Sequence, residues 1–127
     1  MDEPLNWLSG QVVDAAFRIH VRLGSGLLES VYEMVLAYEL EKRGLSVARQ
    51  VPIEIRYDDL FIKEAFRADL IVEDALIIEL KSVETLLPVH SKQLLTYLKL
   101  TNKKLGLLLN FGAPVFKDGI VRLVNGL

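Results

Sequence analysis

Two short segments of the chain are apolar at nearly every position, and they constrain the fold more than any other feature. Ala75 to Leu80 carries a charged residue only at Glu79, and Leu105 to Phe111 is the second such segment. A strand that is covered on both faces has this composition, whereas a half-exposed strand alternates apolar and polar residues. We therefore expect Ala75 to Leu80 to be a central strand of a sheet.

Apolar residues at intervals of three and four indicate helices on either side of these strands. The spacing predicts one helix from Leu5 to Leu23, a second that ends near Arg43, and a third over Pro88 to Thr101. Gly44 is placed to cap the second helix in the left-handed conformation. Gly24-Ser25-Gly26 follows a helix, not a strand, so we interpret it as a helix-helix turn and not as a phosphate-binding loop.

Apolar and polar residues alternate from Val47 to Tyr57, which predicts a half-exposed strand. Two further strands are expected over Leu60 to Val72 and, after a turn, over Gly119 to Asn125. Pro52 cannot donate a ladder hydrogen bond, so its strand should lie at an edge of the sheet or be bulged there. The order of elements is ααβββαββ, an α/β fold, and without repeats or linkers we expect one domain over residues 1–127.

The composition narrows the classes of function. No cysteine is present, so any metal site must use oxygen or nitrogen ligands, and the net charge of -2 does not resemble a protein held on DNA by a broad basic face. No apolar run is long enough to span a membrane, and the first residues do not resemble a signal peptide, so we expect a cytoplasmic protein. The hydrophobic content of 51% motivates the hypothesis that a second copy covers some apolar surface, as in a homo-oligomer.

Asp69, Glu79 and Lys81 are polar residues inside otherwise apolar strands. A carboxylate in such a place is costly unless a cation, a metal ion or hydrogen-bond donors compensate it. Because strand side chains alternate, Glu79 and Lys81 share one face, and a tight connection at Glu73-Asp74 sets Asp69 beside Glu79. We predict that the three polar groups converge at one end of the sheet.

Two carboxylates on adjacent strands are the oxygen ligands that Mg²⁺ or Mn²⁺ prefers. Such an ion stabilises charge on a phosphate and lowers the pKa of a bound water, and Lys81 is placed to position that water or to contact the phosphate. The alternative is a buried salt bridge from Lys81 to Glu79 or Asp69 with no catalysis. The spacing alone leaves both interpretations open.

Four further segments carry a resemblance to a known family. Gly26 to Tyr32 fits the signature GxxExxY, Arg67 to Leu70 reads RADL, Ile77 to Lys81 reads IIELK, and Gln93 to Leu98 follows in the same order. The chain resembles the GxxExxY proteins, which are placed in the PD-(D/E)xK nuclease-like superfamily. Ser25 stands where a proline is usual in that family, a difference that affects only the start of the second helix.

The resemblance implies a PD-(D/E)xK, or restriction-endonuclease-like, fold with a central mixed sheet flanked by helices. It also implies a Mg²⁺- or Mn²⁺-dependent nuclease. The residues that it assigns to the site are the helix acid Glu29, the metal ligands Asp69 and Glu79, the catalytic lysine Lys81, and Gln93 and Tyr97 of the following helix. Glu29 is a candidate third metal ligand, although a solvated glutamate in the first turn of a helix is an alternative interpretation.

Other polar residues give weaker signals. His20 and His90 are candidates for a supporting role near the site, but a satisfied structural histidine is the simpler interpretation of each. Arg67, Lys92 and Lys99 are candidates for a rim that contacts phosphates of a nucleic acid, or else are solvated surface residues.

Three hypotheses follow. The first is a metal-dependent nuclease that acts on DNA or RNA. The second is a catalytically inactive module of the same fold that binds nucleic acid or a protein partner. The third is a self-assembling protein in which the carboxylates and Lys81 form a structural ion-pair cluster.

Overall fold

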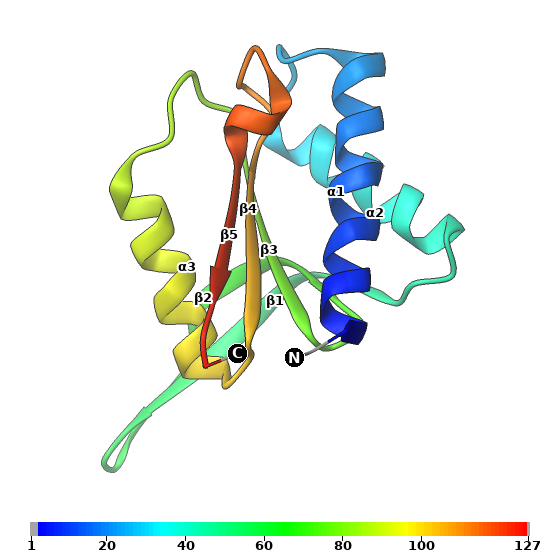
Figure 1. Cartoon of the computed structure of the whole chain (residues 1–127). Coiled ribbons are helices and arrows are strands. Elements are labelled where there is room, and N and C mark those ends of the chain that lie inside the picture. The colour runs from blue at the N-terminus through cyan, green and yellow to red at the C-terminus, as the bar shows by residue number, and fades with distance from the viewer. Residues whose placement is uncertain (1–2, 127) are drawn as a thin grey trace.

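The structure is a computed structural model that describes residues 3–126. Its elements follow the predicted order, with one short 3-10 helix in addition (Figure 1). The elements are α1 (Glu3–Leu23), α2 (Glu29–Lys42), β1 (Val47–Tyr57), β2 (Leu60–Val72), β3 (Leu76–Lys81), α3 (Pro88–Thr101), β4 (Leu105–Asn110), η1 (Phe116–Gly119) and β5 (Ile120–Val124). The predicted helices and strands are confirmed, and η1 directly precedes the last strand.

The five strands form one mixed sheet in the order β1-β2-β3-β4-β5. Neighbouring strands are antiparallel except β3 and β4, which are parallel and joined through α3. Helices α1 and α2 cover one face of this sheet, and α3 covers the other (Figure 1). The predicted α/β fold with helices on both faces of a mixed sheet is therefore confirmed, and β3 is its central strand.

The side chains of β3 and β4 are buried on both faces, which explains their apolar sequences. One core cluster packs α1 and α2 against Leu76, Ile78 and other inward-facing residues, and a second packs Leu94 and Leu98 of α3 against the opposite face. Gly106 of β4 allows α3 to approach closely, because a Cβ atom there would lie 3.0 Å from the side chain of Leu94. The central strand thus lies between two apolar layers.

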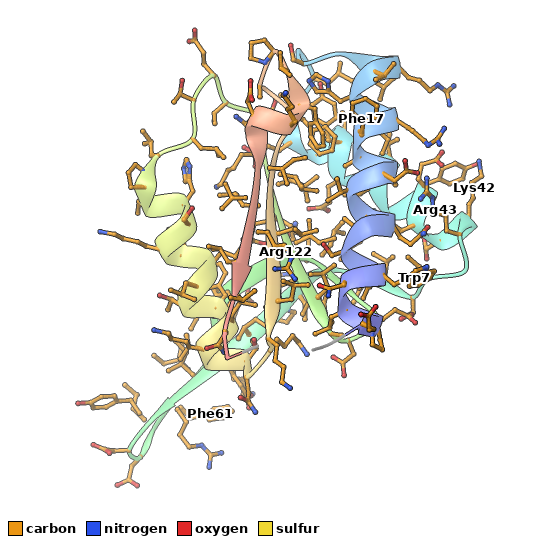
Figure 2. All side chains as sticks on the ribbon, in the orientation of Figure 1. Trp7, Phe17, Lys42, Arg43, Phe61 and Arg122 are labelled. Atoms are coloured by element: carbon orange, nitrogen blue, oxygen red, sulfur yellow. The ribbon has the colours of Figure 1, made fainter. Side chains whose placement is uncertain are left out.

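The first strand lies at the edge of the sheet, as the position of Pro52 predicts. The pairing of β1 with β2 shifts register between Ile53 and Ile55. Beyond that shift the two strands continue as a hairpin arm that projects from the body of the protein, with Phe61 near its end (Figures 1 and 2). Tyr57 is exposed on this arm because no helix reaches so far.

Candidate functional site

The candidate site is built where β2 and β3 run side by side, toward the carboxyl end of β3. The pairing of Leu70 with Ile78 places Asp69 next to Glu79 on the neighbouring strand, as predicted. The strand alternation puts Lys81 on the same face as Glu79. Asp69, Glu79 and Lys81 are all half-buried.

The two carboxylates hold the strands together at this point. The backbone N–H of Asp69 donates a hydrogen bond to Oε2 of Glu79 at 2.8 Å, and the N–H of Leu80 donates to Oδ2 of Asp69 at 2.9 Å. Oε1 of Glu79 accepts no hydrogen bond from residues 3–126. Because every buried side-chain oxygen in that range has a partner, Oε1 is in contact with solvent. One oxygen of Glu79 is therefore free for a ligand.

The surroundings of both carboxylates disfavour their negatively charged forms. Burial, and next the charge of Asp69, raise the pKa of Glu79 to about 8, although the Asp69 amide and the Lys81 ammonium partly oppose the shift. Burial also raises the pKa of Asp69, against the hydrogen bond from the Leu80 amide. An isolated ionised pair of this kind favours either a proton or a metal cation.

Lys81 forms no salt bridge of 4 Å or less with any residue between 3 and 126. Its positive charge nevertheless lowers the pKa of Glu79, so the ammonium lies near the pair without closing on it. The alternative prediction of a salt bridge from Lys81 to Glu79 or Asp69 is therefore wrong for this structure, because backbone amides, and not the lysine, hold the two carboxylates. The ammonium stays available for another anion.

Helix α2 places two glutamates near the pair, and they differ in burial. Glu29, the helix acid of the signature, is exposed at the first position of α2, and its negative charge is the smallest of the causes that raise the pKa of Asp69. Glu33, one turn further along, is only 6% exposed and acts more strongly on Asp69. Glu33 was not predicted as a site residue, although its position next to Tyr32 and one turn before Leu36, both buried, was a signal that it points inward.

Glu33 is fully occupied by hydrogen bonds from β1. Its Oε2 accepts from Nη2 of Arg49 at 3.0 Å and from Nε at 3.2 Å, and its Oε1 accepts from Nε2 of Gln50 at 2.6 Å. The same nitrogen of Gln50 lies 3.4 Å from Oδ1 of Asp69. Gln50 therefore belongs to the site, and no sequence pattern indicated this.

Helix α3 contributes Tyr97 from the other side. Its ring stacks on Phe66 of β2, with centroids 3.7 Å apart and planes at 8°. Burial and then the charges of Glu79 and Asp69 raise the pKa of the phenol, so Tyr97 is a neutral hydrogen-bond donor near both carboxylates. Gln93 is exposed one turn earlier and lines a groove of about 360 Å³ with Tyr97 and Lys92.

Tyr32, the last residue of the signature, has a structural role. It is completely buried and stacks on Phe111 at a centroid distance of 4.4 Å. Its hydroxyl donates to the carbonyl oxygen of Gly24 at 2.5 Å and accepts from the N–H of Leu27 at 3.1 Å. Tyr32 thus fixes the turn between α1 and α2 that ends at Glu29, which confirms that the Gly24-Ser25-Gly26 segment is a helix-helix turn.

Both histidines have structural partners elsewhere. Nε2 of His20 is 2.8 Å from the carbonyl oxygen of Ala113, and its ring packs against Phe116. Nδ1 of His90 accepts from the N–H of Leu87 and so caps the start of α3. These contacts favour the interpretation of both residues as structural histidines.

The predicted basic rim is only partly organised. Arg67 bonds to Glu64 and donates to the carbonyl oxygen of Gln50 at 3.1 Å. Lys92 and Lys99 are exposed on α3 and form no salt bridge within residues 3–126. A role of these residues in binding nucleic acid stays a prediction.

The carboxylates of the site fit the predicted metal ion only in part. No three Asp, Glu or His side chains among residues 3–126 are gathered in a group that could hold a metal ion, so Glu29 is not grouped with Asp69 and Glu79 in this structure. The pair itself fits a hard divalent cation, because it offers carboxylate oxygens and an excess of negative charge. The assignment of these three residues as metal ligands stays a prediction.

The sequence was compared with known proteins. A family model described as the PD-(D/E)XK nuclease superfamily matches residues 6–123. No curated protein and no solved structure matches the chain. No helix within residues 3–126 is long and apolar enough to cross a membrane. Since the match covers nearly all of the sequence, the chain belongs to the PD-(D/E)XK nuclease superfamily.

Proposed function

We propose that this chain is a Mg²⁺- or Mn²⁺-dependent nuclease that hydrolyses phosphodiester bonds in DNA or RNA. The observation that carries the proposal is the uncompensated pair of Asp69 and Glu79 at the end of the central strand, with the unpaired ammonium of Lys81 on the same face. Membership of a superfamily that is typically metal-dependent supports it.

Asp69 and Glu79 would hold the divalent ion, through the oxygens that are not committed to backbone amides. When bound, such an ion supplies charge stabilisation at phosphorus and lowers the pKa of a coordinated water. Lys81 binds a phosphate oxygen or orients the attacking water, because no carboxylate of the described chain neutralises its charge at salt-bridge distance.

Residues on the two helices contribute from either side. Tyr97 donates a hydrogen bond to a phosphate oxygen from its neutral phenol, and Gln93 offers an amide at the exposed edge of the same helix face. Glu29 is exposed to solvent at the start of α2, where its carboxylate would bind a water molecule near the metal ion. Arg67, Lys92 and Lys99 lie further out and contact the nucleic-acid backbone.

The raised pKa of Glu79 predicts how activity depends on pH. A metal ion and a proton compete for this carboxylate, so metal binding releases a proton as long as the pH is below the folded pKa of about 8. We expect activity at a limiting metal concentration to rise with pH up to about 8 and then to level off.

The test is a cleavage assay with single-stranded, duplex and branched DNA and RNA in Mg²⁺, Mn²⁺ or EDTA. We expect metal-dependent cleavage of at least one substrate, and a loss of about 10²- to 10³-fold or more in Glu79→Gln and in Lys81→Met. Glu54→Gln, an exposed residue on the outer part of β1, is the matched control and should retain activity. Absence of cleavage of all substrates, or undiminished cleavage by Lys81→Met, contradicts the proposal.

A second candidate function is a nucleic-acid-binding module without catalysis. It is favoured by one observation: both carboxylates already accept backbone hydrogen bonds, and no third carboxylate among residues 3–126 completes a metal site with them. This function predicts that nucleic-acid binding survives Glu79→Gln and that Mn²⁺ does not bind the wild type. Isothermal titration with Mn²⁺ separates the two functions.

A further inference from the structure

Gln50 has an unusual backbone conformation for its place in the fold. Its φ angle is +50°, in the left-handed region that residues with a side chain rarely adopt. Among residues 3–126, the other non-glycine residues with positive φ all lie in turns or at a helix end, namely Asp58, Glu73, Asp74 and Asn102. Gln50 alone adopts this conformation inside a strand, and strained backbone of this kind persists where other interactions impose it.

Gln50 lies opposite Asp69 in the pairing of β1 with β2. Arg49 pairs with Leu70 and Val51 pairs with Ala68, so the residues between them face each other across β1 and β2. The backbone carbonyl of Gln50 accepts from Nη1 of Arg67 at 3.1 Å. Val47 packs against the core cluster under α1 and α2, whereas Val51, four residues further along β1, packs against the cluster under α3. The alternation of β1 is therefore interrupted around Gln50, and from this position its amide reaches Asp69 and Glu33.

The carboxylates fix which way the amide points. Glu33 and Asp69 accept hydrogen bonds when ionised, so the NH₂ group of Gln50, with its two hydrogens, must face both of them. The bond to Glu33 is short, at 2.6 Å, and the contact with Asp69 is longer, at 3.4 Å. Arg49 holds the other oxygen of Glu33, so Glu33 acts as a rigid anchor that holds the amide in place.

We propose that Gln50 is a positioning residue for the nuclease site: anchored on Glu33, its amide orients the Asp69 carboxylate for metal binding, at the expense of backbone strain. This inference rests on the proposed function, because it assigns Asp69 as a metal ligand. It also changes the role of α2, whose buried acid Glu33 acts on the site through Gln50 and not as a metal ligand.

The test compares two substitutions that both remove the amide. Gln50→Ala keeps the backbone strain and Gln50→Gly relieves it, so Gln50→Gly should melt a few degrees higher than Gln50→Ala. Both variants should lose about 10-fold to 100-fold in Mn²⁺ affinity, measured by isothermal titration, because both lose the positioning contact. The result that supports the inference is an equal loss of Mn²⁺ affinity in Gln50→Ala and Gln50→Gly although their melting temperatures differ.

Asp58 offers a matched control at the far end of the same hairpin. It has a φ of +52° in the turn between β1 and β2 and makes no ion pair within residues 3–126. Asp58→Gly should also melt above Asp58→Ala, with Mn²⁺ affinity unchanged in both. This pair measures the cost of the left-handed conformation away from the site.

Three outcomes would overturn the inference. Wild-type Mn²⁺ affinity in both Gln50 variants would show that the amide does not position Asp69. Affinity that falls with stability, lower in Gln50→Ala than in Gln50→Gly, would show a purely structural role. In either case the proposed function stands if Asp69→Asn still abolishes Mn²⁺ binding. Absence of Mn²⁺ binding by the wild type would instead overturn the proposed function and this inference together.

Discussion

Carboxylates at two places in this protein have opposite electrostatic environments: Asp14 lies between two arginines, and Asp69 lies beside Glu79. Asp14 of α1 accepts hydrogen bonds from Nη2 of Arg43 at 2.8 Å and from Nε of Arg18 at 3.0 Å. Arg43, at the end of α2 (Figure 2), also donates to Gln11. The hydrogen bond from Arg43, followed by that from Arg18, lowers the pKa of Asp14. This cluster ties two helices together and is satisfied by itself.

The pair of Asp69 and Glu79 has no such partners. No arginine or lysine among residues 3–126 lies within salt-bridge distance of either carboxylate, and burial raises both pKa values. Keeping the two carboxylates together in their ionised forms therefore lowers the free energy of unfolding. Acidic residues with pKa values raised by burial and by each other are typical of functional sites, whereas the cluster around Asp14 is typical of a structural one.

The largest expected effect that distinguishes the clusters is that of Glu79→Gln on stability. The folded protein holds a proton on Glu79 up to a pH of about 8, while the unfolded chain releases it near 4.5. The contribution of Glu79 is therefore fully present below pH 4.5 and is lost as the pH rises to 8. Glutamine retains the bond from the Asp69 amide without the charge, so we expect a gain at pH 8 on the order of a few kcal/mol.

Urea unfolding at several pH values between 5 and 8 measures this effect. The wild type should lose stability as the pH rises, and Glu79→Gln should show a much flatter profile, with only the contribution of Asp69 left. A wild-type stability that is constant over this range would contradict the conclusion that the pair is uncompensated.

The second effect in size is stabilisation by a divalent cation. Mn²⁺ at a concentration about 100 times its Kd should stabilise the wild type by about 2.7 kcal/mol at pH 8, because it binds only the folded site. Thermal melts with Mn²⁺ and then with EDTA measure the shift and its reversal. An equal shift in an Asp69→Asn, Glu79→Gln double variant would show that the cation binds elsewhere.

The smallest effect is expected at the satisfied cluster. The pKa of Asp14 is lowered in the folded state, so its contribution is present above pH 3.8 and is lost as the pH falls through the folded pKa. Asp14→Asn should cause a small loss of stability at neutral pH that about 1 M NaCl screens away. It should leave both the pH profile between 5 and 8 and the Mn²⁺ affinity unchanged. A change in either would mean that the two clusters are coupled.

Local patterns in the sequence were sufficient for most of the fold. Helix and strand periodicities depend on residues that are close in the chain, so the predicted span of α3 agrees with the structure, and the two fully apolar segments form the central strands β3 and β4. Strand alternation and one tight turn also placed Asp69 beside Glu79, since both are properties of a single hairpin. The position of Pro52 at the sheet edge followed from one missing N–H.

The sequence by itself thus determined the order of the elements, the burial of the central strands on both faces, and the position of Asp69 beside Glu79. Only the tertiary structure decided that Glu33 raises the pKa of Asp69 more than Glu29 does, that Tyr32 anchors a turn, and that Gln50 reaches Asp69. Each of these results depends on how side chains of different elements meet, and not on the periodicity of one element. They depend on the register of packed elements and, at Gln50, on one backbone angle that no periodicity encodes.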